Sequence, residues 1–397
     1  MDDKISSIDQ TDNNTTIFKQ EQPQSWCCWA SWCCWASWCC WPSWCCWPSW
    51  CCSKRQVTYR IPALLYISEN KTYLAFAEKR KTPNDTDADK LVMRRGLWEE
   101  DKKNIKWDSG HQLLSSACLP NHRSMNPCPV YERESKTLFI FFICVPYGVS
   151  ETIQIKAKKN QARLCYVTSP DNGNIWSDIT ELKDVISENE KNWATFAVGP
   201  GHGIQMKDGR LIIPAYVYHF AQPNAPESHA VTFFSDDKGH TWHVGKHMEA
   251  ESNECQMAEI TDDSNSLLYC NARSTSGYRV EALSTSKGED FEKPLTVQKL
   301  KETGEGCQGS VLYIPSSKLL LYSHPTDEHK RNNLGIYVNK SPPDPDQWTP
   351  INPNIYNGPS GYSDLAECEN RGYIACLMEC GEKKETEKID FKFFKYQ

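Results

Sequence analysis

The sequence predicts an all-β fold of the β-propeller type, and two features of the chain carry that prediction. The first is a series of short β-rich runs that recur between polar turns from residue 59 onward. Examples are residues 137–145 (TLFIFFICV), 210–218 (RLIIPAYVY), 318–324 (KLLLYSH) and 334–339 (LGIYVN). Short strands at regular spacing, joined by turns rich in Gly, Asp and Ser, are typical of sandwiches, barrels and propellers. No long helical periodicity competes with them.

The second feature is a repeated turn motif, the Asp-box, which favours the propeller among these folds. Ser235–Trp242 (SDDKGHTW) has the full form S-x-D-x-G-x-T-W. Ser169–Trp176 (SPDNGNIW) repeats it with Ile in the Thr position, and Ser284–Phe291 (STSKGEDF) is a degraded third copy. In such a turn, Ser and Asp accept backbone hydrogen bonds, Gly takes the unusual dihedrals, and the aromatic side chain packs beneath the hairpin. The motif indicates a fold and no particular activity.

Charge and hydropathy exclude several functional classes. The net charge of −7 argues against a general nucleic-acid-binding protein, which needs an excess of Lys and Arg. The N-terminus has acidic residues where a secretory signal has basic ones, so secretion is not expected. The longest strongly apolar run of the main body, Leu138–Val145, is too short for a transmembrane helix and predicts a buried strand. We therefore expect an intracellular protein, either cytoplasmic or peripheral to the plasma or endosomal membrane.

The cysteines fall into two groups, one clustered near the N-terminus and one scattered along the rest of the chain. Ten of the 20 lie between Cys27 and Cys52, and the other ten are scattered without a zinc-type pair of CxxC motifs. In a chain with no secretory signal, the scattered thiols are expected to be reduced and buried.

The N-terminal cysteines belong to a six-residue repeat over residues 25–52, written SWCCWA twice, SWCCWP twice and SWCC once. Three hypotheses stay open: a duplicated or mistranslated segment without a fold, an interfacial anchor built from Trp and acylated Cys, or a soft-metal-binding tract. None supplies catalysis. We expect residues 1–53 to form a disordered segment outside the domain, and residues 54–397 to form the propeller.

A series of motifs resembles animal exo-α-sialidases (neuraminidases) over residues 57–391. In order, they are YRIP (59–62), FAEKR (76–80), HRSMNPCP (122–129), WATFAVGPGHG (193–203), IPAYVY (213–218), ECQMAE (254–259), NARS (271–274), GCQGS (306–310), SHPT (323–326) and GYSDL (361–365). The set most resembles plasma-membrane ganglioside sialidases, or sialidase type 3, although the stretch between Gln308 and Tyr322 lacks the long insertion of mammalian type 3 enzymes. The resemblance implies a six-bladed β-propeller.

The resemblance assigns three arginines to the substrate's carboxylate. Sialic acid carries this group on its anomeric carbon, and guanidiniums bind it through fixed, permanently charged donor forks. The matching residues are Arg60, Arg273 and Arg331, which lie in distant parts of the chain. They are expected to meet on loops at the central face of the propeller.

The same carboxylate explains the catalytic residues that the resemblance implies. An anionic nucleophile would be repelled by the substrate, whereas a neutral Tyr is not, and sialidases use Tyr. Tyr362 matches the nucleophile and Glu254 the base that activates it. Asp85 matches the acid that protonates the leaving group, although Asp87 and Asp89 in the same segment are rivals.

The remaining matches concern orientation and substrate contacts. Glu379 matches the acid that orients the first arginine of the triad, and Arg80 is expected beside Asp85. Residues that match contacts to the glycerol and N-acetyl arms are Met125, Asn126, Glu151, Tyr216, Tyr218 and Gln308. No motif indicates a metal or an organic cofactor.

The sequence thus predicts an exo-α-sialidase that hydrolyses terminal α-linked sialic acid on gangliosides, glycoproteins or oligosaccharides, with retention at the anomeric carbon. Two alternatives stay open, a catalytically silent sialic-acid-binding propeller and a trans-sialidase. The partners expected are sialylated glycoconjugates and, peripherally, a membrane, while the oligomeric state is left open.

Overall fold

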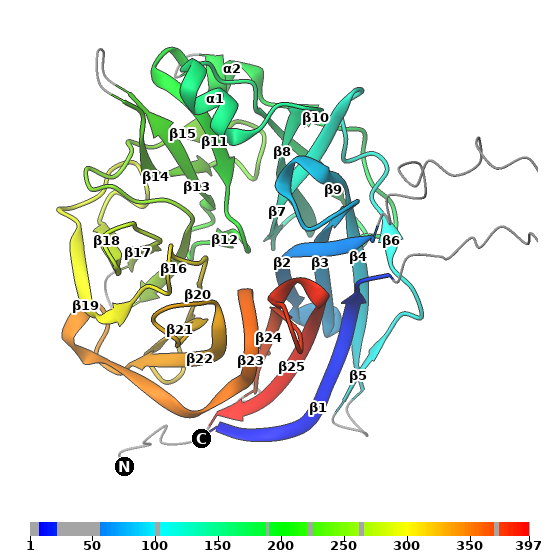
Figure 1. Ribbon diagram of the computed structural model, residues 1–397, viewed down its shortest axis with the longest axis vertical. Helices are drawn as coiled ribbons and strands as arrows, with labels where there is room; N and C mark the ends of the chain where they lie inside the picture. The colour runs from blue at the N-terminus through cyan, green and yellow to red at the C-terminus, as the bar shows by residue number, and fades with distance from the viewer. Residues whose placement is uncertain are drawn as a thin grey trace, which may run out of the picture.

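The computed structural model describes residues 8–21, 56–99, 104–187, 190–220, 225–261, 266–368 and 373–396. The Trp/Cys repeat over residues 25–52 lies outside these ranges, so the hypotheses about it stay predictions. The described chain is all-β apart from short helical turns, as predicted, and its sheets stand side by side around a centre in a propeller-like arrangement (Figure 1).

Four sheets follow one another along the chain, each antiparallel and connected between neighbouring strands. The first contains β2 (Thr58–Ile67), β3 (Thr72–Arg80), β4 (Ala88–Glu99), β5 (Asn104–Trp107) and β6 (Gln112–Leu113). The second contains β7 (His122–Glu132), β8 (Thr137–Pro146), β9 (Arg163–Ser169) and β10 (Thr180–Glu181). The third contains β11 (Trp193–Val198), β12 (Ile204–Gln205), β13 (Leu211–His219), β14 (Glu227–Ser235) and β15 (His243–Val244). The fourth contains β16 (Cys255–Thr261), β17 (Ser266–Ala272), β18 (Tyr278–Ser284) and β19 (Leu295–Lys301).

The last sheet has seven strands, because one long strand takes part in two sets of pairings. Its members are β20 (Ser310–Ile314), β21 (Leu319–Pro325), β22 (Asn332–Asn339), β23 (Trp348–Cys368), β24 (Tyr373–Cys380), β25 (Lys388–Tyr396) and β1 (Ile8–Lys19). The first part of β23 pairs with β22, and its second part, from Ser360 onward, pairs with β24.

The helical segments of the described chain are short. They are α1 (Glu151–Ala157), α2 (Lys183–Ser187) and the 3₁₀ turns Ser68–Asn70, Asp85–Asp87, Glu190–Asn192, Pro345–Gln347 and Glu385–Glu387. Among the described residues, no helix is long and apolar enough to cross a membrane.

The core lies between neighbouring sheets, which explains why some strands are apolar on both faces. Strand β8 contains Leu138–Val145, which was predicted to be a buried strand, and every residue of that run is buried. Phe141 belongs to the cluster that includes the third sheet and contacts Trp242, with ring centroids 4.5 Å apart. Its neighbour Phe142 points the other way, into the cluster shared with the first sheet. Successive side chains of β8 point to opposite faces, so this one strand contributes core residues to the interfaces with both neighbouring sheets.

The repeated turn motif forms a hydrogen-bonded loop at each of its copies. In the fullest copy, Ser235 Oγ accepts from Gly239 N at 2.8 Å, and Asp237 Oδ1 accepts from Thr241 N at 2.8 Å. The Gly239 φ angle is 89°, which favours glycine. The corresponding Ser–Gly bonds at Ser169 and Ser284 are also 2.8 Å long.

The predicted domain boundary at residues 53 and 54 is wrong for residues 8–19, which form strand β1 on the outer edge of the last sheet. Strand β1 pairs antiparallel with β25. Thr16 Oγ1 donates to Asp390 Oδ1 at 2.7 Å, and Phe18 is buried and stacks on Tyr59 with centroids 5.5 Å apart. The prediction placed all of residues 1–53, including the Trp/Cys repeat, outside the domain, but an edge strand needs only one apolar face and a partner.

The cysteines of the described chain are free thiols. Nine of the ten are buried, and Cys118 is half-buried. Their placement agrees with the expectation that the scattered cysteines are apolar core residues.

Candidate active site

A cavity of about 450 Å³ is lined by strands and connecting segments from several sheets. Its walls carry both signs of charge, in contrast to the apolar interfaces between the sheets. The predicted site residues among its lining are Arg80, Asp85, Met125, Asn126, Glu151, Tyr216, Tyr218, Glu254, Arg273 and Tyr362. Residues from distant segments thus meet at one place, whereas Arg60, Arg331, Gln308 and Glu379 are not among the lining residues.

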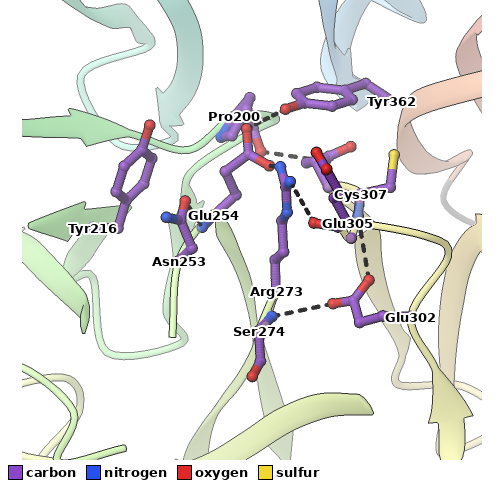
Figure 2. Close-up of polar contacts among 12 residues, drawn as sticks. Pro200, Tyr216, Asn253, Glu254, Arg273, Ser274, Glu302, Glu305, Cys307 and Tyr362 are labelled. Carbon is purple, nitrogen blue, oxygen red and sulfur yellow. Dashed lines mark hydrogen bonds and ion pairs between the residues drawn. The ribbon is translucent and has the colours of Figure 1, made fainter. Parts of the chain in front are cut away.

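Tyr362, Glu254 and Arg273, which all line the cavity, form a connected polar group (Figure 2). The Tyr362 hydroxyl donates a short hydrogen bond to Glu254 Oε1. The other oxygen of the same carboxylate, Oε2, lies 2.9 Å from Arg273 Nη1. Glu254 therefore holds a phenolic proton on one side and a guanidinium on the other, which is the arrangement of a base next to a nucleophile.

Two further guanidiniums lie against the ring of Tyr362. The Cζ atoms of Arg60 and Arg331 are 5.3 and 5.2 Å from the ring centroid. The three arginines that the resemblance assigned to a carboxylate are thus gathered around the predicted nucleophile. They concentrate three positive charges around one side chain, in a protein whose net charge is −7.

The environment keeps Tyr362 neutral at rest. Burial raises the pKa of its hydroxyl well above the ordinary value, and the Glu254 carboxylate adds to the rise, whereas Arg331 and Arg273 lower it. The hydroxyl can ionise only if its proton passes to the hydrogen-bonded Glu254, and the phenolate formed would then lie among the guanidiniums. The geometry fits a nucleophile that is activated during the reaction.

Glu379 on β24 binds Arg60 through both of its carboxylate oxygens. Its carboxylate is fully buried and accepts from Arg60 Nε at 3.0 Å and from Nη2 at 3.1 Å. It also accepts from the backbone N–H of Ile61 at 2.9 Å and of Tyr362 at 3.3 Å. One carboxylate therefore links the first arginine to the backbone of the tyrosine.

Asp85 lies at the rim of the cavity in the 3₁₀ turn after β3, with 70% of its side chain exposed. Its Oδ1 is 2.6 Å from Arg80 Nη1 and 3.9 Å from Arg60 Nη1. Burial raises the pKa of the Asp85 carboxyl, but Arg80 and Arg60 outweigh that effect and hold it below its ordinary value.

The rivals of Asp85 are engaged elsewhere. Asp87 accepts from Thr82 Oγ1 at 2.5 Å, and Asp89 accepts from the Tyr147 hydroxyl at 2.8 Å. Neither is part of the cavity lining, whereas Asp85 is. Of the three aspartates in this segment, the cavity lining therefore includes Asp85 alone.

Five of the six predicted substrate-contact residues line the cavity, and Gln308 does not. Gln308 is buried, and its amide exchanges hydrogen bonds of 3.0 Å with the backbone N–H and C=O of Ser363. It fixes the strand that carries Tyr362. Its position in the centre of a motif gave no information on where the side chain points.

Glu151, the first residue of α1, has an unusual ionisation among the lining residues. Burial, followed by the nearby Glu254 and Asp85 carboxylates, raises its pKa to about 7. Its Oε2 lies 3.4 Å from the Tyr216 hydroxyl, which donates to it. The charge of the cavity wall at Glu151 can therefore change near neutral pH.

Sequence reasoning missed two buried ions that belong to the site. Arg123 lines the cavity and donates to the carbonyls of Pro146 and Val149 at 2.8 and 2.6 Å. Glu78 is fully buried and accepts from Arg80 Nε and from the backbone N–H of Asn126, both at 2.7 Å. Both lie inside motifs that were recognised, and the alternation along β3 could have placed Glu78 with Arg80.

Comparisons with known proteins agree with this geometry. The family model of the BNR repeat-like domain matches residues 71–376. Sialidase-3 of Mus musculus is 45% identical over 385 residues, which cover 85% of this chain and 91% of that protein. The chain belongs to the animal sialidase family. Sialidase-3 of Homo sapiens is 43% identical over 391 residues, covering 86% of the chain and 90% of that protein. Sialidase-2 of Mus musculus is 44% identical over 344 residues, covering 82% and 90%.

Solved structures support the fold of the sialidase. The Hadza microbial sialidase Hz136 matches with a TM-score of 0.67 at 19% identity, covering 85% of this chain and 66% of that one. An intramolecular trans-sialidase from Ruminococcus gnavus matches with a TM-score of 0.66 at 17% identity, covering 85% and 94%. The predicted resemblance to type 3 animal sialidases is confirmed, and the protein is a glycoside hydrolase of the neuraminidase class.

Proposed function

We propose that this sialidase cleaves terminal α-linked sialic acid by a double displacement in which Tyr362 is the nucleophile and the anomeric configuration is retained. One observation carries the proposal: the buried Tyr362 hydroxyl donates to Glu254 and lies among Arg60, Arg273 and Arg331. A carboxylate nucleophile would be repelled by the substrate's own carboxylate, whereas a neutral phenol is not.

In the first step, the arginines hold the substrate carboxylate and place the anomeric carbon over Tyr362. The phenolic oxygen attacks that carbon while its proton passes to Glu254. The bond to the aglycone oxygen breaks, and Asp85 gives its proton to that oxygen. The product of this step is a sialyl–tyrosine ether, with Glu254 protonated and Asp85 ionised.

The depressed pKa of Asp85 has a consequence for this step. In the free protein Arg80 and Arg60 favour the ionised carboxylate, which cannot donate a proton. A substrate carboxylate bound to Arg60 adds a negative charge beside Asp85 and so raises its pKa. Substrate binding would thus favour protonation of the Asp85 carboxylate. Activity is expected to be highest at mildly acidic pH.

In the second step, water attacks the anomeric carbon from the face that the aglycone left. Asp85 takes a proton from the water, and Tyr362 leaves as a phenolate that regains its proton from Glu254. Two displacements at one carbon restore the original configuration, and every group returns to its starting state.

We also propose that the sheets form six blades with Asp-box turns. The double pairing of β23 supports this count, because its two parts divide the seven-stranded sheet into two four-stranded groups. The serine-to-glycine bonds at Ser169, Ser235 and Ser284 support the turns.

The similarity to sialidase-3 supports gangliosides as substrates and a peripheral membrane location, which we include in the proposal. Release of sialic acid from ganglioside-containing vesicles, compared with a soluble sialoglycoprotein, tests the substrate. The membrane and soluble fractions of cells that express the full chain, compared with a variant lacking residues 25–52, test the location. Faster turnover of the soluble glycoprotein would contradict gangliosides as the substrate. Recovery of the full chain in the soluble fraction alone would contradict the membrane location.

The central experiment uses the full chain and a fluorogenic sialoside. Tyr362→Phe should lower kcat by about 1000-fold or more, because the nucleophile is lost. Tyr313→Phe is the matched control, since Tyr313 is similarly buried and donates to Thr261 O away from the cavity. Proton NMR should show the α-anomer as the first product. A β-anomer, or a Tyr362→Phe variant with wild-type kcat, would overturn the mechanism.

A further inference from the structure

Glu302 is a buried carboxylate outside the cavity that joins segments from several strands. It follows β19 directly and is 5% exposed. Its Oε1 accepts from Arg279 Nη1 at 2.9 Å and from Ser274 N at 3.2 Å. Its Oε2 accepts from His324 Nε2 at 3.1 Å and from Cys307 N at 3.2 Å. Both oxygens are therefore fully used, and two of the four donors are backbone groups.

Those two backbone groups lie next to the arginines of the site. Ser274 follows Arg273 directly, so Glu302 holds the chain at the base of that side chain. Cys307 belongs to the segment 302–307, which we call the carbonyl loop. Figure 2 shows Glu302 between Ser274 and Cys307, on the opposite side of Arg273 from Tyr216.

The carbonyl loop binds two of the three carboxylate-binding arginines through its backbone oxygens. Arg273 Nη2 donates to Glu305 O at 2.8 Å, and Arg331 Nη2 donates to Gly306 O at 3.1 Å. The loop also holds the chain before Arg331, because Thr303 Oγ1 donates to Lys330 O at 2.6 Å. Movement of this loop would shift both guanidiniums together.

The contact between the loop and Arg273 leaves no free space. A Cβ atom on Gly306 would lie 2.7 Å from Arg273 Nε, and the φ angle of Gly306 is +86°. Glycine is required there for both reasons. The position of the loop therefore determines the position of Arg273.

We propose that Glu302 is a positioning residue for substrate binding, which fixes the carbonyl loop so that Arg273 and Arg331 converge on the carboxylate of the sialoside. The proposal rests on the proposed function, because it takes the arginines as the carboxylate site. Arg279 and His324 act as the supports of Glu302 on the side away from the cavity. Arg279 also donates to Cys307 O at 2.9 Å, so it holds the loop a second time.

The contacts with Arg279 and His324 also keep the Glu302 carboxylate negatively charged. Burial raises its pKa, but Arg279 and then His324 outweigh that effect and bring it to about 2. The residue is therefore an anion at any pH at which the enzyme could work, and its role does not depend on titration.

The test compares Glu302→Gln with Glu281→Gln in the full chain. Glu281 is a buried carboxylate on β18 that accepts from Tyr269 and Trp348 and, within the described chain, has no hydrogen bond to the carbonyl loop. A glutamine at 302 replaces one acceptor oxygen by an NH₂ donor, so at least one of the hydrogen bonds that hold the loop is lost. We expect KM for a fluorogenic sialoside to rise about 10-fold with kcat changed less than about 3-fold, the pattern of lost substrate binding.

A purely structural role would give a different pattern. If the two variants lose similar melting temperature and Glu302→Gln keeps the wild-type KM, the positioning role is wrong. The dissociation constant of the inhibitor 2-deoxy-2,3-dehydro-N-acetylneuraminic acid, measured by calorimetry, should rise with KM. A wild-type chain that neither binds this inhibitor nor releases sialic acid would instead overturn the proposed function itself.

A second pair of variants keeps the test decisive if Glu302→Gln does not fold. His324→Leu removes one donor to Glu302, whereas His324→Gln restores an N–H near the position of Nε2. We expect KM to rise about 3-fold or more in the leucine variant and to return towards wild type in the glutamine variant. Equal KM values for both variants and the wild type would overturn the proposal.

Discussion

Replacing Glu379 by Gln perturbs the site at its most constrained point. The carboxylate accepts hydrogen bonds from two nitrogens of Arg60 and from the backbone N–H groups of Ile61 and Tyr362. Glutamine keeps the shape but loses the charge, and its amide NH₂ would face N–H donors. Arg60, whose side chain is only 12% exposed, would then be a buried cation without its main partner.

The expected magnitude follows from the burial of this pair. Breaking a buried ion pair by changing one partner costs about 3–5 kcal/mol, and the open cavity beside Arg60 favours the lower end. Because a domain of this size shifts by about 1.5 °C per kcal/mol, the melting temperature should fall by about 4–7 °C. Because Arg60 and the Tyr362 backbone would both lose their fixed positions, kcat/KM should fall by about 100-fold.

Thermal melting and steady-state kinetics on the same preparations measure both effects. Glu132→Gln is the matched control, because Glu132 is equally buried but accepts from Gln205 and from the backbone N–H groups of Glu134 and Ser135. It should lower the melting temperature and leave kcat/KM within about 2-fold of wild type. A Glu379→Gln variant with wild-type kcat/KM would refute the role assigned to this contact.

Three further predictions address the acid, its pKa and the N-terminal strand. Asp85→Asn should lower kcat by about 100-fold or more for sialyllactose, whose leaving group needs a proton, and Asp89→Asn should not; similar rates for both variants would contradict the assignment of Asp85. Arg80→Gln removes a cation that lowers the pKa of Asp85, so the acid stays protonated to higher pH and the alkaline limb of the kcat/KM profile should move upward. An unmoved or downward-shifted limb would contradict that reasoning. Deleting residues 2–20 exposes the partners of Phe18 and should lower the melting temperature by about 5 °C or more, whereas an unchanged value would contradict the pairing of β1 with β25.

The proposed catalytic group could be selected from the sequence because its chemistry restricts residue type. An anionic anomeric centre requires several guanidiniums and a nucleophile that is not an anion, and the motifs that supply them lie near the ends of strands. The structure brings Tyr362, Glu254 and Arg273 into direct contact, although 108 residues separate the tyrosine from its base. The topology brings these distant segments together because each of them lies in or directly beside a strand that reaches the cavity, Glu254 before β16, Arg273 after β17 and Tyr362 within β23.

Positions that depend on side-chain direction were not predictable in the same way. Gln308 stands in the middle of a recognised motif, yet its amide is used by the backbone of Ser363. Glu302 lies outside the recognised motifs, and Glu78 lies inside one without a role assigned to it, yet both are buried carboxylates that hold the arginines and the backbone of the site. A linear pattern does not report which carboxylate faces a guanidinium across a sheet.

Strand β1 shows a third limit of prediction from the sequence. Its residues, IDQTDNNTTIFK, have no regular apolar alternation, and its hydrogen bonds come from a strand at the other end of the chain. Asn14 Nδ2 and Thr16 Oγ1 both donate to Asp390, at 2.9 and 2.7 Å. Only the tertiary partner makes this segment a strand, so local propensity could not identify it.

Covalent trapping tests the central claim most directly. A 3-fluorosialosyl fluoride, which forms the glycosyl–enzyme rapidly and releases it slowly, should add one sialyl group to the full chain. Mass spectrometry of the digested protein should place that group on Tyr362, and Tyr362→Phe should abolish the adduct. An adduct on a carboxylate such as Glu254, or turnover of ordinary sialosides with no adduct at any residue, would contradict the account.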